Sequence, residues 1–185
     1  PRGRSEGAVA GGAAERCDDA AAIEFAEFHD LPNRWLVGWS FGTELALKHG
    51  TDPAVEGAIL LSPPLHRATD DDLDRWDAFG KPLVVLVPEL DDYQRPDEAR
   101  RRCARVRNAE VLGGERAQHL CVGESSVRRV LDEIVGHVRP GFPLPLPTTW
   151  DGDASGTADR DTAASDQARS GAGRAPAGAA PRAAG

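Results

Sequence analysis

Short apolar runs alternate with amphipathic segments between residues 15 and 138. The runs are 35–37, 57–61, 83–87 and 109–112, and prolines or glycines follow the last three. Apolar runs without polar alternation are typical of strands that are covered on both faces of a parallel sheet. Because helical patterns separate the runs, the chain predicts a one-domain α/β fold with about four strands, right-handed crossovers and flanking helices.

The helical patterns differ in strength. Segments 15–29, 41–49 and 96–105 have plausible apolar faces or helix-start signals, and Pro96 suits the first turn of a helix. Segment 125–138 has the clearest pattern, with one stripe of apolar residues: Val127, Val130, Leu131, Ile134, Val135 and Val138. In segment 65–81 we expect at most a short helix, with Asp70, Asp71 and Asp72 as a cap and a solvated face.

The composition changes after Pro140. Residues 141–147 are rich in proline, and the remainder to Gly185 is mainly Ala, Gly, Ser, Asp, Arg and Pro. Such a segment buries too little apolar surface to offset the entropy of ordering it. The sequence therefore predicts a folded domain over 1–140 and a disordered tail over 141–185, with residues 1–14 as a loop.

Charge and cysteine content exclude several classes of protein. The net charge of −8 argues against a nucleic-acid surface, and no apolar run has the length of a membrane span. The three cysteines, Cys17, Cys103 and Cys121, lack metal-site spacing and are interpreted as reduced thiols of a cytoplasmic protein, with Cys121 as buried filler. We expect no metal or cofactor and no nucleic-acid or membrane partner; the oligomeric state stays open.

Candidate chemistry begins at Gly38-Trp39-Ser40-Phe41-Gly42, which matches G-x-S-x-G between a predicted strand and a predicted helix. In this nucleophile elbow the serine occupies a strained turn, and the helix that follows directs its free N–H groups at the reaction centre. We expect both glycines to be needed because strand and helix pass too close for a Cβ. Ser40 is the candidate nucleophile.

A serine nucleophile needs a base, and the base needs an acid that orients it. Asp91 lies three residues beyond the strand that Pro88 closes, and His119 precedes the last predicted helix. Both positions follow strand ends, where parallel sheets carry their sites. Asp92 and Glu89 are alternative acids, and we favour Asp91. Of the other histidines, only His66 could approach the site.

Three segments together resemble an α/β-hydrolase: Gly38–Gly42, Pro88–Asp92 and Gln118–Leu120. Segment Arg2–Gly7 resembles the loop after the fourth strand of the small lidless members, with one residue missing. The resemblance covers about residues 1–139 and implies that the four strands here are the fifth to eighth of eight. The first strands, and the loop that donates a second oxyanion N–H, lack counterparts, so we interpret the chain as a fragment of a longer hydrolase.

The resemblance implies a serine hydrolase that cleaves an ester, thioester or small amide through an acyl-enzyme. Ser40 would attack a small-molecule acyl substrate, His119 would move the proton and Asp91 would orient His119. The N–H of Phe41 is the assignable oxyanion donor. Trp39 and Phe41 could line the acyl pocket, although we expect Trp39 to pack in the core. The alternatives are a non-catalytic binding module of the same fold or an inactive fragment, and a reassigned chemistry such as acyl transfer.

Overall fold

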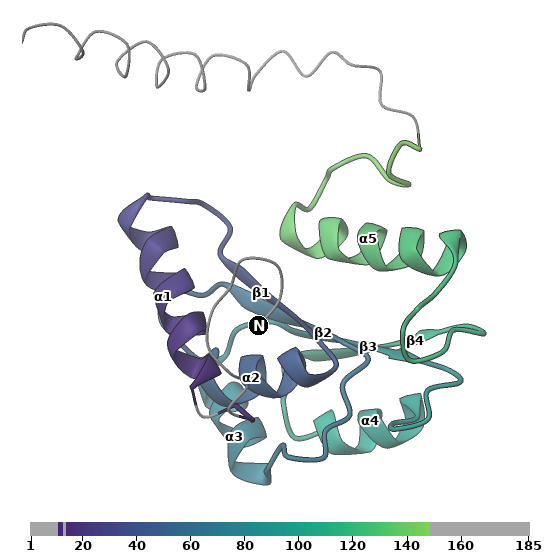
Figure 1. Ribbon diagram of the computed structural model, residues 1–185, viewed down its shortest axis with the longest axis horizontal. Coiled ribbons are helices and arrows are strands. Elements are labelled where there is room, and N and C mark those ends of the chain that lie inside the picture. The colour runs from purple at the N-terminus through teal and green to yellow at the C-terminus, as the bar shows by residue number, and fades with distance from the viewer. Residues whose placement is uncertain (1–10, 13, 149–185) are drawn as a thin grey trace, which may run out of the picture. The chain divides into compact units, whose positions relative to one another are not determined.

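Four parallel strands form one sheet in the computed structural model, which describes residues 11–12 and 14–148. The strands are β1 (Trp35–Trp39), β2 (Gly57–Leu61), β3 (Leu83–Pro88) and β4 (Ala109–Gly114), in the spatial order β1-β2-β3-β4 (Figure 1). Each strand pairs in parallel with the next one in sequence, and a parallel pair needs a crossover connection, which is a helix in each case here. This architecture confirms the predicted α/β fold with four parallel strands.

Of the five helices in the described residues, one precedes β1, three connect consecutive strands and one follows β4. They are α1 (Glu15–Phe28), α2 (Phe41–His49), α3 (Asp70–Phe79), α4 (Pro96–Cys103) and α5 (Glu124–Val138). Helices α2, α3 and α4 cover one face of the sheet and α5 lies on the other (Figure 1). Helix α1 packs beside α2, where Ile23 contacts a small cluster with Val55 and Leu36.

The core has two parts because the strand residues alternate between the faces of the sheet. Strand residues Ala58, Leu60, Val85 and Val87 pack against Trp76 and the other apolar residues of α2 to α4. Facing α5, the buried residues are Ile59, Leu61, Val84, Leu86, Cys121 and Val130. Strands β2 and β3 are buried along their whole length, which explains their unbroken apolar sequences.

Helix α3 corrects one expectation for segment 65–81. It is a regular helix of 10 residues, started by a capping box in which Thr69 and Asp72 bond each other's backbone N–H. Asp72 is also only 4% exposed, and it forms ion pairs with Lys48 (3.2 Å) and Arg75. The expectation of a solvated acidic face is therefore wrong for Asp72, whose carboxylate ties α3 to α2.

The proline-rich stretch after α5 packs on that helix as far as Leu146. The N–H of Leu146 donates to Asp132 Oδ1 (2.8 Å), and the compact unit ends at Leu146, six residues beyond the predicted boundary at Pro140. The rest of the predicted tail from 149 onward, like segment Arg2–Gly7, lies outside the described residues.

Candidate active site

Ser40 lies between β1 and α2 in a backbone conformation that L-residues rarely adopt. Its φ and ψ are 50° and −113°. Three hydrogen bonds hold it there: its N–H donates to Leu61 O (2.9 Å), and its carbonyl accepts from the N–H (3.0 Å) and the hydroxyl (2.6 Å) of Thr43. Strained backbone of this kind costs about 1–3 kcal/mol and persists only where the surroundings enforce it.

The two glycines of the elbow have different roles. A Cβ on Gly38 would lie 2.5 Å from the carbonyl oxygen of Gly42, because the strand passes directly against the first turn of α2. A Cβ on Gly42 would meet nothing within 4 Å. The expectation that close approach requires glycine is correct for Gly38 and wrong for Gly42.

Ser40, His119 and Asp91 lie in one hydrogen-bonded row. Ser40 Oγ is 2.8 Å from His119 Nε2, and His119 Nδ1 is 2.8 Å from Asp91 Oδ2. A carboxylate can only accept, so the Nδ1–H donates to Asp91 and Nε2 is left to accept the Ser40 hydroxyl hydrogen. This is the tautomer that a histidine needs in order to take a proton from the serine.

The carboxylate of Asp91 is held rigidly in a buried position. Asp91 is 1% exposed, and its Oδ1 accepts the backbone N–H groups of Tyr93 (2.8 Å) and Gln94 (3.3 Å). These two bonds leave Oδ2 for His119. The backbone of the loop that carries Asp91 therefore orients the carboxylate toward His119.

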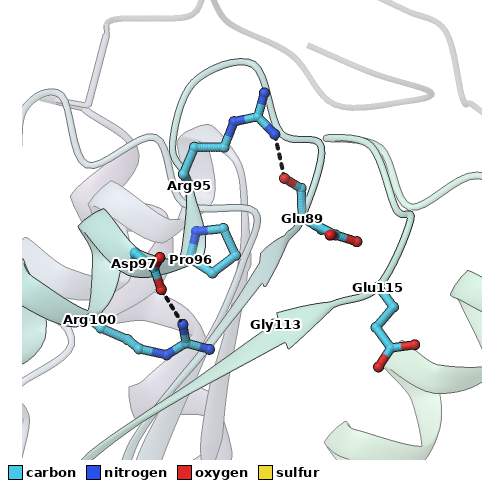
Figure 2. A pocket seen from close by; sticks show the side chains of 7 residues that line it. All are labelled: Glu89, Arg95, Pro96, Asp97, Arg100, Gly113 and Glu115. Carbon is cyan, nitrogen blue, oxygen red and sulfur yellow. Dashed lines mark hydrogen bonds and ion pairs between the residues drawn. The ribbon is translucent and has the colours of Figure 1, made fainter.

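The competing acids face elsewhere. Asp92 is exposed. Glu89 Oε2 accepts the N–H of Arg116 (2.8 Å) and lines a charged cleft of about 590 Å³ with Arg95, Arg100 and Glu115 (Figure 2). The residues that line this cleft include none of Ser40, Asp91 and His119, so hydrogen bonding, rather than cavity size, identifies the candidate site.

Of the remaining histidines, His66 is linked to the candidate site through Tyr93, and the others make their contacts elsewhere. Its imidazole lies 5.9 Å from the ring of Tyr93, which in turn lies 4.7 Å from that of His119 (centroid distances). His137 bonds Glu110 and the carbonyl of Glu133 instead. His29 packs on the rings of Phe25 and Phe28, and His49 is exposed at the end of α2.

Trp39 and Phe41 flank the serine, one on each side in sequence. Trp39 is 46% exposed, and its indole Nε1–H donates to the carbonyl of His119 at 3.4 Å. The expectation of core packing for Trp39 is therefore wrong, because alternation places its side chain on the α5 face of the sheet, where the described residues leave the edge strand β1 partly uncovered. Phe41 is 38% exposed and is the first residue of α2, so its N–H belongs to the first turn, which lacks intrahelical acceptors.

Tyr93 is a neighbour of the site that sequence reasoning missed. Its backbone holds Asp91 and its ring contacts His119 at an interplanar angle of 61°. In the sequence, an aromatic residue two positions after a candidate acid is only a weak signal of a site residue, because aromatic residues in loops also serve packing alone.

Cys121 lies next to the site as a buried thiol. It is 4% exposed, and its Sγ is 3.9 Å from Ser62 Oγ. Burial is the main effect and raises the pKa of the Cys121 thiol. The hydrogen bond with Ser62 lowers this pKa, and the nearby Asp91 charge raises it. A raised pKa keeps the thiol protonated and weakly nucleophilic.

The described residues contain no cluster of three or more His, Cys, Asp or Glu side chains with the arrangement of a metal site. Within the same residues, no helix is long and apolar enough to cross a membrane.

Comparison with known proteins gives structural similarity but no sequence match. No family model and no curated protein matches the chain. An alpha-beta serine hydrolase homologue from Coxiella burnetii superposes with a TM-score of 0.58 at 20% identity, over 74% of this chain and 62% of that one. A serine hydrolase without a lid from Xanthomonas campestris gives 0.59 at 20%, over 76% and 64%. An esterase from Pyrococcus furiosus gives 0.55 at 18%, over 74% and 65%.

The chain thus spans less than two thirds of the length of each of these three structures. The similarity covers 74–76% of this chain, which holds four parallel strands with flanking helices. The chain has the α/β-hydrolase fold.

Proposed function

We propose that this chain carries the catalytic residues of a serine hydrolase that cleaves an ester, thioester or small amide through an acyl-enzyme. The observation that carries the proposal is the continuous row of two 2.8 Å hydrogen bonds from Ser40 through His119 to the buried Asp91. The esterase and serine hydrolase structures of similar fold support the same reaction class.

The proposed reaction proceeds in two halves. Ser40 Oγ attacks the acyl carbon while His119 Nε2 takes its proton, and Asp91 stabilises the imidazolium through Nδ1–H. The tetrahedral intermediate places its oxyanion at the N–H of Phe41. His119 then gives the proton to the leaving group, which departs, and water hydrolyses the acyl-Ser40 ester by the same relay.

Labelling by a fluorophosphonate probe tests the nucleophile directly. The full chain should be labelled on Ser40, and Ser40→Ala should abolish the labelling. Ser125→Ala, at an exposed serine at the start of α5, is the matched control and should leave labelling unchanged. Labelling that persists in Ser40→Ala would refute the assignment, and a wild-type chain without labelling would favour the non-catalytic binding module.

A further inference from the structure

Two aromatic side chains beyond the serine, histidine and aspartate follow one another outward from His119. The ring of Tyr93 lies against His119 at 4.7 Å, and the imidazole of His66 lies on Tyr93 at 5.9 Å and 74°. Tyr93 is 55% exposed and His66 is also exposed. The two rings therefore form an open aromatic surface next to His119.

Hydrogen bonds to two helices hold the loop that carries His66. Glu44 of α2, 6% exposed, accepts the backbone N–H of Arg67 (3.0 Å). Arg102 of α4 donates to the carbonyls of Leu65 and Ala68, both at 2.7 Å. Since the flanking backbone is fixed on both sides, His66 is presented at a defined place.

The backbone of Tyr93 is held by its hydrogen bond to Asp91. Its N–H is committed to Asp91 Oδ1, so the backbone of Tyr93 cannot shift without releasing the carboxylate. The backbone that carries the ring is therefore held beside the imidazole, and the half-exposed ring is open to a ligand.

The chemistry of the reaction says which part of the substrate meets this surface. The leaving-group oxygen or sulfur must reach His119 Nε2 to receive its proton, so the group that it carries passes next to His119. We propose, on the basis of the function above, that Tyr93 and His66 form a subsite for the leaving group. This subsite selects alcohols or thiols that carry a flat aromatic ring over those that carry a saturated ring. Aromatic rings attract one another in offset or edge-to-face geometry beyond their burial of area.

A matched pair of esters tests this selectivity. Benzyl acetate and cyclohexylmethyl acetate share the acyl group and nearly the same size, and they differ in the aromaticity of the leaving group. For the full chain, kcat/KM should favour the benzyl ester by about two- to tenfold. Tyr93→Phe should keep this ratio, Tyr93→Leu should bring it close to one, and His66→Ala should lower it in part.

The controls separate the subsite from general damage. Every Tyr93 variant keeps the backbone N–H that holds Asp91, and the readout is the ratio of kcat/KM for the two esters, from which a general loss of activity cancels. Phe28→Ala, at an exposed aromatic of α1, should leave the ratio unchanged. A wild-type ratio near one, or an equal ratio in wild type and Tyr93→Leu, would overturn the subsite.

A second measurement needs no turnover. Benzyl alcohol should slow fluorophosphonate labelling of Ser40 at a lower concentration than cyclohexylmethanol does, and Tyr93→Leu should remove the difference. Labelling without any such difference would overturn the subsite and leave the nucleophile assignment intact. Absence of labelling would instead overturn the proposed function, and the subsite with it.

Discussion

Strained backbone gathers around the candidate site. Of the seven non-glycine residues with positive φ in the described part of the chain, five follow the carboxyl ends of strands: Ser40, Ser62, Leu65, Arg116 and Cys121. Such conformations need support from surrounding contacts, and they concentrate where a structure must hold groups for function. The hydrogen bonds of Ser40 to Leu61 and Thr43 supply that support at Ser40.

The acid assignment predicts unequal effects for two neighbouring aspartates. Asp91→Asn should lower kcat for ester hydrolysis by about 10⁴-fold, because an amide can stabilise the wrong tautomer of His119. Asp92→Asn is the matched control, since Asp92 is exposed, and it should stay near wild-type activity. Steady-state kinetics of both variants is the measurement, and a large loss for Asp92→Asn alone would contradict the assignment.

The elbow glycines should respond oppositely to alanine. Gly38→Ala places a Cβ 2.5 Å from a backbone oxygen, and overpacking of this kind costs about 1–3 kcal/mol of unfolding free energy. Gly42→Ala enters open space within a helix and should be neutral or slightly stabilising, because alanine favours helices over glycine. Chemical denaturation measures both, and equal losses would argue against the close approach at Gly38 as the reason for its glycine.

Among the elements, α5 is attached to the edge strand β4 through a histidine. His137 Nδ1 is 2.8 Å from Glu133 O, and Nε2 is 3.2 Å from Glu110 Oε2. Both partners are acceptors, so only the imidazolium can donate to both. Burial lowers the pKa of His137, but the bonds to Glu133 and Glu110 outweigh it and raise the pKa above its usual value.

This contact predicts a pH-dependent stability. A raised folded-state pKa means that the contribution is fully present below about pH 6.5 and is lost as the pH rises through the folded pKa. His137→Gln should therefore lower the unfolding free energy by up to about 1 kcal/mol at pH 5.5, since Glu110 is exposed, and by less at pH 9. Denaturation at both pH values, with His49→Gln as the control, tests it; a difference independent of pH would contradict the charged contact.

On the scale of the whole molecule, the α5 face of the sheet is incompletely covered by the described residues. Strand β1 lies at the edge of the sheet, and Val37 and Trp39 on that face are 47% and 46% exposed. On α5, Val127 and Leu131 of the predicted stripe are 47% and 46% exposed. An apolar edge strand with free backbone groups tends to pair with other chains.

We therefore expect residues 1–185 to self-associate through this edge. Val37→Lys should raise the monomer fraction, because a charge on an edge strand opposes pairing. Val122→Lys, at a loop residue that is 75% exposed, is the control and should have a smaller effect. Size-exclusion chromatography is the measurement, and a monodisperse wild-type monomer would contradict the prediction.

The sequence by itself determined the order and type of the elements. The apolar runs at 57–61 and 83–87 coincide with β2 and β3 to within one residue, because a strand buried on both faces admits no polar residue. Ser40, His119 and the acid segment around Asp91 could be predicted as neighbours, since a parallel sheet brings the carboxyl ends of its strands to one edge.

Only the tertiary structure decided what depends on contacts between distant segments. The choice of Asp91 over Asp92 follows from which carboxylate faces His119, a residue 28 positions away. The exposure of Trp39, the burial of Asp72 and the open space at Gly42 depend likewise on neighbours from other elements. The local sequence pattern sets the secondary-structure propensity of a segment, whereas the surroundings of a side chain are set by the residues of other elements that pack against it.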